Sequence, residues 1–384
     1  MTSAFFSPSE LDSRVARVRD DMDAAHLDVL VVVSPEDIYY LTGLNHQGHF
    51  ALTALVVPLD GPMLLVARAM EAPTIAAQVP QGVHVPFKDD QDPAAVLAAA
   101  VRSVARSGAV VGIEQTSMSL PVSVWEPLRA TLDADRLVDG SGIVGPLRQV
   151  KSPAEIELVR RAASASSRAM EAGLAAVKEG VSQPDVVAAV YAELILAGRE
   201  YPAMPPLIRS REDLLQEHMS WSDSPIASGD AMFFELSASV GRYHAPLTRM
   251  AYIGEPPPGT EVAAAIATSG LDAVRDALRP GVLADDVYAA WQAVVDEGLG
   301  HSSYRRHHCG YVIGIGFPPS WTGGAGVVGL RSGSDMPIRE GMTFHVLSWI
   351  LDQEPADFVL SDTVLVTPDG GEILTTTRRD PIVI

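Results

Sequence analysis

One acidic residue stands out as a candidate for chemistry because it interrupts an apolar run. Glu235 lies in residues 232–236, Met-Phe-Phe-Glu-Leu, where every other side chain suits a protein core. Burying a lone carboxylate is costly, so such a group is usually paired with a cation or functional. Two interpretations follow: a structural ion pair with Arg242 or Arg249, or a catalytic carboxylate. We favour the catalytic one.

Several histidines could serve the same chemistry. His218 precedes a turn, a position that by itself indicates a surface or capping residue. His244 and His345 lie in segments expected to be strands lining one cleft, and each suits a hydrogen-bonded core histidine as well as a ligand contact. His307 and His308 are adjacent, so on a strand they would face opposite ways and could not bind one metal ion together.

Several familiar catalytic signals are absent from the sequence. Gly314-Ile315-Gly316 lacks the third glycine of a dinucleotide fingerprint, and there is no phosphate-binding loop, no His-Glu-x-x-His and no Gly-x-Ser-x-Gly. Between Gly298 and Leu351 the only acids are Asp335 and Glu340, which is few for a site that holds two metal ions.

Composition and charge narrow the class of partner. A net charge of −20 disfavours nucleic acid and anionic membranes, because both need a basic face. The longest apolar runs, such as 29–33, are too short to span a bilayer, and the first residues lack the layout of a signal peptide. The single cysteine, Cys309, allows no intrachain disulfide and no cysteine-based zinc site. We expect a cytoplasmic protein that acts on a small molecule.

The elements that must position these side chains fall into two domains. Helical and strand-like periodicities alternate in the first part of the chain, which predicts an α/β domain over residues 1–148. The expected helices cover about 11–25 and 93–104, and the expected strands cover 28–33, 51–57, 63–67 and 109–113. Ser152, Pro153 and Glu155 then form a capping-box pattern that starts a long helix, so a second domain is expected over 149–384.

The second domain contains a tandem pseudo-repeat. The repeated segments are 177–181 with 278–282, and 225–229 with 337–341. Two such halves, each made of two helices followed by strands, predict a pseudo-twofold domain with one curved sheet under the helices. Sites often form where two halves meet. The repeat puts Leu347 at the position equivalent to Glu235, so only one half supplies a carboxylate.

With these features in place, the chain resembles the creatinase/aminopeptidase P group. The motifs that carry the resemblance are 38–43 (ending Tyr-Leu-Thr-Gly), 150–155 at the domain junction, Gly229-Asp230, Thr248-Arg249 and Glu340-Gly341-Met342. The resemblance implies a creatinase-type α/β N-terminal domain followed by an α+β catalytic domain of the "pita-bread" fold.

The peptidases of this group bind two metal ions through two Asp, one His and two Glu. The resemblance aligns those five ligand positions with Glu235, Pro246, Tyr311, Leu347 and Ser361. Pro and Leu cannot ligate a metal, and Tyr and Ser are poor replacements for His and Glu. The resemblance therefore implies a metal-free branch without a cofactor, in which Glu235 is the one surviving carboxylate.

Two metal-free enzyme types share this fold, and the ectoine hydrolases match better than creatinase. His218 matches the general acid/base histidine of creatinase, but the creatine-binding arginine is missing from 317–322. The stretches that resemble ectoine hydrolases are 234–235, 242–249, 310–314, 317–321 and 341–345. Residues 322–326, which are small and neutral, and 358–362 depart from the ectoine hydrolase pattern.

This resemblance implies ring-opening hydrolysis of a cyclic amidine such as ectoine or hydroxyectoine to an N-acetyl-diaminobutyrate. Glu235 would act as nucleophile or base, and His218 would move the proton that the departing nitrogen needs. The residues that would bind the substrate and exclude water are Tyr243, His244, Tyr311, Trp321 and His345. Two alternatives stay open: a creatinase-like amidinohydrolase acting on an open-chain guanidino or amide compound, and a non-catalytic small-molecule binding protein.

The resemblance also implies a homodimer in which the N-terminal domain of one subunit closes the site of the other. The segment 45–50, with His46 and His49, would then contact the substrate of the partner subunit. A polar loop that follows the Leu-Thr-Gly turn explains the same residues equally well.

Overall fold

The computed structural model describes residues 5–132, 136–210, 213–324 and 326–384. The chain divides into two compact units, Met1–Arg148 and Gln149–Ile384. Among the residues that the structure describes, no helix combines the length and apolar character that crossing a bilayer requires.

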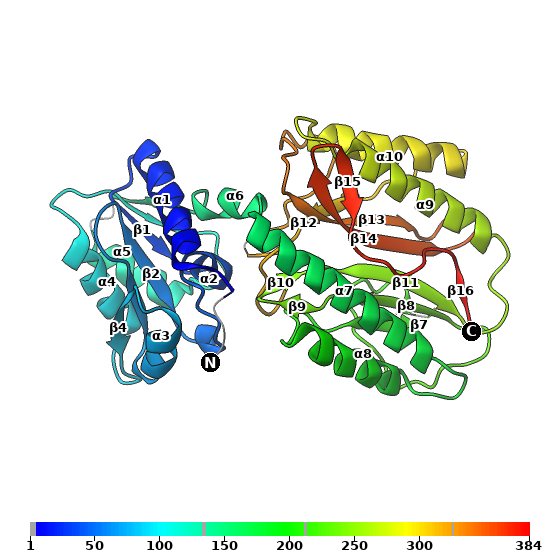
Figure 1. Cartoon of the computed structure of the whole chain (residues 1–384), viewed down its shortest axis with the longest axis horizontal. Coiled ribbons are helices and arrows are strands. Elements are labelled where there is room, and N and C mark those ends of the chain that lie inside the picture. The colour runs from blue at the N-terminus through cyan, green and yellow to red at the C-terminus, as the bar shows by residue number, and fades with distance from the viewer. Residues whose placement is uncertain (1–4, 133–135, 211–212, 325) are drawn as a thin grey trace. The chain divides into compact units, whose positions relative to one another are not determined.

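The first unit is built on a six-stranded mixed sheet in the order β4-β3-β2-β1-β5-β6 (Figure 1). Its strands are β1 (Val29–Val32), β2 (Ala54–Pro58), β3 (Leu64–Arg68), β4 (Val83–Phe87), β5 (Val111–Ile113) and β6 (Leu137–Asp139). Its helices are α1 (Pro8–Ala24), α2 (Pro35–Thr42), α3 (Ala72–Gln78), α4 (Pro93–Val104), α5 (Val122–Thr131) and α6 (Val144–Gln149), with 3-10 turns η1 (Gly48–Phe50) and η2 (Ala69–Glu71). Every residue of β1 is buried, as a continuous Val/Leu run in a central strand requires. The predicted α/β class is confirmed.

The second unit carries the second sheet, whose main path is β12-β13-β14-β11-β8-β7. Its strands are β7 (Leu207–Ser210), β8 (Ala231–Leu236), β9 (Ser239–Val240), β10 (Tyr243–His244), β11 (Leu247–Tyr252), β12 (Gly310–Val312), β13 (Thr343–Ile350), β14 (Phe358–Thr367), β15 (Gly370–Ile373) and β16 (Ile382–Val383). Its helices are α7 (Pro153–Ala176), α8 (Gln183–Gly198), α9 (Thr260–Ala277) and α10 (Ala284–Leu299). Strand β15 extends the sheet from β14, β16 pairs with β11, and β9 and β10 form a separate ribbon.

The long helix of the second unit begins where the sequence predicts. The Ser152 hydroxyl accepts a hydrogen bond from the Glu155 amide, and the Glu155 carboxylate accepts one from the Ser152 amide. Pro153 occupies the first turn, where its missing N–H costs nothing. The predicted capping box is therefore confirmed.

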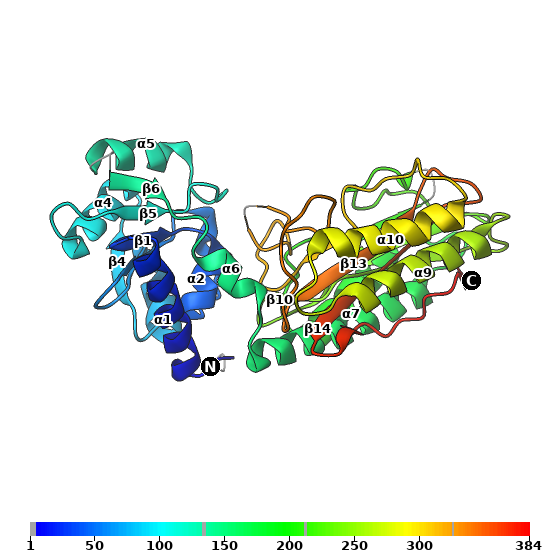
Figure 2. The ribbon, with the colours of Figure 1, turned by 90° about the horizontal axis from the view of Figure 1, so that it is seen from above.

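The predicted pseudo-repeat has the same backbone hydrogen bonds in both halves. Gly180 N donates to Ile226 O and Gly281 N donates to Ile338 O, both at 2.8 Å. The reverse bonds, from Ile226 N to Val181 O and from Ile338 N to Val282 O, are also 2.8 Å each. In each half a helix pair packs side by side, α7 with α8 (Figure 1) and α9 with α10 (Figure 2). The two halves are therefore structural copies.

The faces of the sheet follow from strand alternation. Even-numbered side chains of β8, such as Phe234, belong to the apolar cluster with α7 and α8. In the other half, Trp291 of α10 donates a hydrogen bond to Ser348 of β13 at 3.0 Å. The odd-numbered residues of β8 and β13, which include Glu235 and Leu347, therefore face away from the helices.

Candidate active site

One row of side chains crosses the sheet on the face turned away from the helices. Glu235 of β8 is paired across the ladder with Thr248 of β11, and Thr248 is paired with Ser361 of β14. Ser361 is in turn paired with Leu347 of β13. The row is symmetric about the β11–β14 pair, so Glu235 and Leu347 hold equivalent outer places in it.

A chain of hydrogen bonds runs beside this row. The Trp321 indole N–H donates to the Tyr311 hydroxyl at 3.0 Å, and that hydroxyl lies 2.9 Å from His345 Nδ1. His345 Nε2 lies 2.6 Å from Ser361 Oγ, which donates to Thr248 Oγ1 at 2.7 Å. Residues from β11, β12, β13, β14 and the loop after β12 are thereby joined in one buried network.

The donors in this network all point the same way. Because Ser361 gives its proton to Thr248, its oxygen must accept a proton from His345 Nε2. His345 Nδ1 is then an acceptor, and it receives the Tyr311 proton. Burial lowers the pKa of His345 to about 3, so the ring stays neutral in this tautomer at physiological pH.

Glu235 lies beside this network without a hydrogen bond to any described residue. Its Oε1 is 3.9 Å from His345 Nδ1, which has no proton to donate. The residue is 5% exposed, and burial raises the pKa of its carboxyl to about 7, against the lowering effect of the Arg209 charge. A carboxyl with this pKa can both accept and return a proton near neutral pH, which is what general acid–base catalysis requires.

The alternative of a structural ion pair for Glu235 is wrong. Arg249 pairs with Asp362 at 2.7 Å and also donates to backbone carbonyls. Arg242 lies 3.7 Å from Glu200, on a different segment. Both arginines thus have other acidic partners, and neither forms an ion pair with Glu235.

Two arginines lie on aromatic rings near Glu235. The Arg209 guanidinium is 3.8 Å from the centre of the Phe233 ring, and the Arg306 guanidinium is 5.2 Å from the Trp349 ring. Phe233 and Trp349 pack edge to face, with centroids 5.6 Å apart. Phe233 and Trp349 together are called the aromatic ledge below. Both cations act on Glu235, since each lowers the pKa of its carboxyl.

His218 is exposed and makes no hydrogen bond or ion pair with Glu235 among the described residues. It lies in a segment that Arg209 anchors, because the Arg209 guanidinium donates to the carbonyls of Leu214, Glu217 and Met219. Residues 213–220, which Arg209 holds in this way, are called the tethered loop below. His218 lies on this loop next to Glu217, outside the buried network.

The side chains of Tyr243 and His244 form hydrogen bonds within the protein. The Tyr243 hydroxyl donates to Glu155 at 2.6 Å, at the start of α7. His244 is fully buried; it accepts a hydrogen bond from the Ala203 amide at Nε2, so its Nδ1–H donates to the Arg242 carbonyl. Both nitrogens of His244 are thus bonded to backbone, which leaves no free ring atom for a substrate.

The expectation that His307 and His308 face opposite ways does not hold. Their ring centroids are 4.2 Å apart and meet edge to face, and His308 also packs on Tyr311. The expectation assumed a strand, but β12 begins only at Gly310. Burial lowers the pKa of His308 to about 4 and also lowers that of His307.

His46 and His49 belong to the first unit. Their rings are 4.3 Å apart, and His46 Nδ1 lies 3.3 Å from Glu71 Oε2. Burial lowers the pKa of His49 to about 3 and also lowers that of His46. The neighbouring Phe50 is 81% exposed. The histidine pair is therefore neutral and lies next to an exposed aromatic ring.

The residues present do not fit the pair of metal ions that the peptidases of this fold hold. Of the five aligned positions, Glu235 alone has a carboxylate, and Ser361 and Tyr311 already bond to His345. Across residues 5–132, 136–210, 213–324 and 326–384, no three His, Cys, Asp or Glu side chains cluster closely enough to hold a metal ion.

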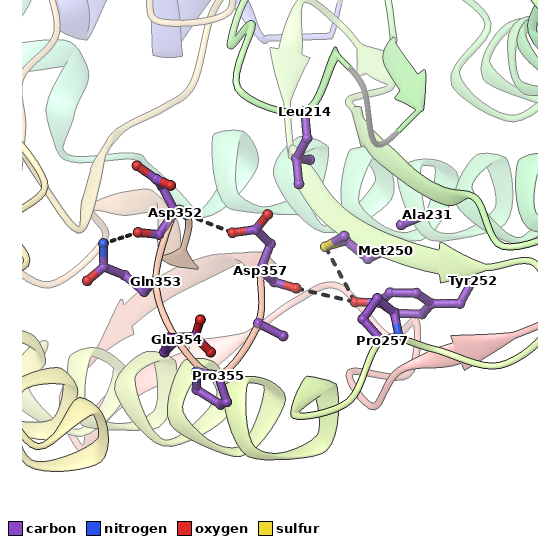
Figure 3. A pocket seen from close by; sticks show the side chains of 11 residues that line it. Leu214, Ala231, Met250, Tyr252, Pro257, Asp352, Gln353, Glu354, Pro355 and Asp357 are labelled. Carbon is purple, nitrogen blue, oxygen red and sulfur yellow. Dashed lines mark hydrogen bonds between the residues drawn. The ribbon is translucent and has the colours of Figure 1, made fainter.

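A separate pocket of about 350 Å³ lies at the other end of β8 and β11 (Figure 3). It includes Ala231 and Tyr252 on these strands, together with the carboxylates of Asp352, Glu354 and Asp357. Ala231 is four residues from Glu235 on the same face, or about 14 Å along the strand. None of the predicted site residues lines this pocket.

Sequence reasoning missed Arg209, Arg306, Thr248 and Phe233. Arg209 carries the signal that singled out Glu235, a charge within an apolar strand, since it follows Leu207 and Ile208. Arg306 follows Arg305 in a polar loop, and nothing in the sequence distinguishes the two.

Comparisons with known proteins agree with this architecture. The model of metallopeptidase family M24 matches residues 157–368, and that of the creatinase/prolidase N-terminal domain matches residues 14–150. The ectoine hydrolase of Halomonas elongata is 28% identical over 96% of both chains. Dipeptidase PepE from Mycobacterium ulcerans has a TM-score of 0.83 at 24% identity over 99% of both chains. A prolidase from Thermococcus sibiricus has a TM-score of 0.85 at 20% identity, covering 97% of this chain and 99% of its own. The predicted pita-bread fold is confirmed.

Proposed function

The chain belongs to metallopeptidase family M24, and from that premise we propose that it is a metal-independent hydrolase that opens a cyclic amidine such as ectoine or hydroxyectoine. The observation that carries the proposal is the state of Glu235, a buried carboxyl with a pKa raised to about 7 and no hydrogen-bond donor on its oxygens among the described residues. Such a group needs a partner with N–H donors, and an amidinium ion supplies them.

Support for metal independence comes from the side chains at the aligned ligand positions. Pro246 and Leu347 have no side-chain atom that can bind a metal ion, and the Ser361 hydroxyl is already used by His345 and Thr248. An amidinium carbon is cationic and electrophilic, so its hydrolysis does not need a Lewis acid. The similarity to an ectoine hydrolase over nearly the whole chain supports the same substrate class.

The proposed mechanism uses Glu235 in two steps. The ionised carboxylate takes a proton from a water molecule as that water adds to the amidinium carbon. Glu235 then returns the proton to the ring nitrogen as the C–N bond breaks; the added hydroxyl becomes the amide carbonyl and gives its own proton to the released amine, which yields an N-acetyl-diaminobutyrate. In the alternative route the carboxylate attacks the amidinium carbon, and the C–N bond breaks to leave an imidoyl ester on Glu235 and the free amine. Water then hydrolyses the ester to the amide, and the carboxyl proton that remains passes to the amine. His218, on its tethered loop, is the candidate for exchanging the proton with solvent.

Tyr311, Trp321 and His345 would form the neutral wall of this site. Their mutual hydrogen bonds occupy the Tyr311 proton and both His345 nitrogens, so the wall offers no charge that competes with Glu235. Because low polarity strengthens the attraction between a carboxylate and an amidinium ion, the wall favours a cationic substrate.

Turnover of a substrate panel by purified protein, with and without a chelator, tests the proposal. We expect hydrolysis of ectoine or hydroxyectoine that survives chelation, and no cleavage of a Xaa-Pro dipeptide. Turnover of creatine instead would favour an open-chain amidinohydrolase, and binding without turnover would favour a non-catalytic binding protein. Stoichiometric Mn, Co, Zn or Fe in the active protein, by elemental analysis, would exclude the metal-free mechanism.

We also propose that the protein works as a homodimer in which residues 45–50 of one subunit approach the site of the other. The exposed Phe50, beside the neutral His46 and His49, supports a contact made through this segment. Measurement of the molar mass in solution tests the dimer, and a monomer that retains full turnover would exclude it.

A further inference from the structure

The aromatic ledge carries two arginines that differ in how many of their donors are used. Arg209 is fully buried, and its Nε, Nη1 and Nη2 all donate to backbone carbonyls of the tethered loop. These bonds hold the loop, so Arg209 cannot take a ligand without releasing it. The role of Arg209 is therefore internal to the fold.

Arg306 has most of its donors free. Its Nη1 donates to Glu217 Oε1 at 2.7 Å, and the side chain is 17% exposed. Among the described residues, its Nε and Nη2 have no acceptor. These two N–H groups lie on one edge of the guanidinium plane, the edge that binds a carboxylate through two parallel hydrogen bonds.

The ring beneath Arg306 also lacks an acceptor. Trp349 is 4% exposed, and its indole N–H is buried without a hydrogen-bond partner among the described residues. A buried donor without an acceptor is unfavourable, and it usually marks a place where a water molecule or a ligand supplies one. Arg306 and Trp349 thus form a group of donors that needs a partner rich in acceptor oxygens.

The spacing between Arg306 and Glu235 suits a small molecule with two opposite charges. Trp349 is two residues along β13 from Leu347, and Phe233 is two residues along β8 from Glu235. A two-residue step is about 7 Å, so the aromatic ledge is one step from the row that holds Glu235. Arg306 is also close enough for its charge to lower the pKa of Glu235.

We propose that Arg306 is a specificity-determining residue, which binds a carboxylate of the substrate through its Nε and Nη2 while Glu235 binds the cationic amidinium end. This inference rests on the proposed function and deepens it: the substrates are small zwitterions with one carboxylate near the amidinium carbon. Neutral amides and dipeptides whose charges lie far apart are poor fits.

The experiment compares Arg306→Gln with Arg305→Gln on two ligands, ectoine and its carboxamide derivative, which lacks the negative charge. Arg305 is the matched control because it loses the same charge one residue away, where it pairs with Asp296. We expect Arg306→Gln to raise the KM for ectoine about 30-fold, since a charged two-bond contact is lost. KM for the carboxamide should stay within about threefold of wild type, since the neutral amide lacks the charge that this contact needs. Arg305→Gln should resemble wild type on both ligands.

Arg306→Lys keeps the charge and loses the two-donor edge, so its KM for ectoine should lie between those of wild type and Arg306→Gln. The proposal is overturned if Arg306→Gln leaves the KM for ectoine unchanged, or raises KM equally for both ligands. Circular dichroism of each variant separates these outcomes from misfolding, and a misfolded Arg306→Gln leaves Arg306→Lys as the deciding variant.

Calorimetric binding of the same two ligands separates this inference from the proposed function. If wild type turns over neither ligand but binds ectoine, and Arg306→Gln weakens that binding about tenfold or more while sparing the carboxamide, the carboxylate site stands and the hydrolase proposal fails. If wild type binds neither ligand, both fail. If turnover of ectoine is normal and independent of Arg306, only the carboxylate site fails.

Discussion

The two halves of the second unit share a backbone and differ in the side chains that face the site. Gly180 and Gly281 make the same hydrogen bonds to Ile226 and Ile338, yet the row that crosses the sheet begins with Glu235 in one half and ends with Leu347 in the other. One half therefore holds the acid, and the other holds an apolar side chain in the equivalent place.

The two halves also differ at the position two residues before Glu235 and Leu347. Phe233 precedes Glu235, whereas His345 precedes Leu347, so polar and apolar side chains are exchanged between the halves. His345 Nδ1 consequently lies 3.9 Å from Glu235 Oε1, and because its ring is neutral it is a hydrogen-bond acceptor and not a second charged group in the site. The comparison teaches that turn and ladder geometry preserve the duplicated frame, while the chemistry depends on a few side chains that need not be symmetric.

The largest expected effect, a loss of kcat, comes from substituting Glu235, and the equivalent residue Leu347 serves as its control. Glu235→Gln keeps the shape and removes the base, so kcat should fall by about a thousandfold or more. Leu347→Met, at the mirrored place, conserves volume and should leave kcat within about threefold. Steady-state kinetics on the best substrate of the panel measures both. Comparable losses in the two variants would show that the halves contribute equally.

A second expectation concerns stability against pH. The pKa of Glu235 is raised from 4.5 to about 7, so the folded chain binds this proton more tightly than the unfolded chain does. Wild-type stability should therefore fall as pH rises from 4.5 to about 7, while Glu235→Gln lacks this loss. The stability gained by the variant should approach about 3 kcal/mol at pH 8 and vanish near pH 4.

Urea unfolding at several pH values measures this difference. Leu347→Met is again the control, because it removes no titrating group and its stability difference from wild type should not change with pH. If the stability difference between Glu235→Gln and wild type does not change with pH, the Glu235 carboxyl has an ordinary pKa.

The smallest expected effect is a difference in stability between alanine substitutions at the two equivalent turns. Gly229 and Gly341 open β8 and β13 with φ of 87° and 82°, so alanine is strained at both. A Cβ at Gly229 meets no atom within 4 Å, whereas one at Gly341 would lie 2.9 Å from the Lys151 carbonyl oxygen. Gly229→Ala should cost about 1–2 kcal/mol and Gly341→Ala at least about 1 kcal/mol more. Equal costs, by urea unfolding, would contradict this asymmetry.

Local features of the fold could be predicted from the sequence. The Ser152–Glu155 capping box, the helix at 93–104 and the strand around Glu235 depend on neighbouring residues, and all three are present. The repeat can be recognised because glycine, which adopts positive φ without strain, recurs at the matching turns of both halves, at 180 and 281 and at 229 and 341.

The network around Glu235 could not be predicted, because it depends on strand register. Tyr311 is 34 residues from His345, His345 is 16 residues from Ser361, and Thr248 is 113 residues from Ser361. His244 has the same sequence signal as His345, yet the backbone takes up both of its nitrogens. Only the packing of distant segments decides which histidine faces the site.

The hydrogen bonds from Trp321 to Thr248 run in one direction, and this direction limits the paths that a proton can take through the site. Trp321 can only donate, and Ser361 gives its proton to Thr248, so the Tyr311 proton points to His345 Nδ1 and the Nε2 proton of His345 points to Ser361. Tyr311, His345 and Ser361 therefore cannot pass a proton back toward the substrate, although all three carry exchangeable hydrogens. A single titration step near the pKa of Glu235 should govern the reaction, and a proton inventory in mixed H₂O and D₂O should be linear, with one proton in flight.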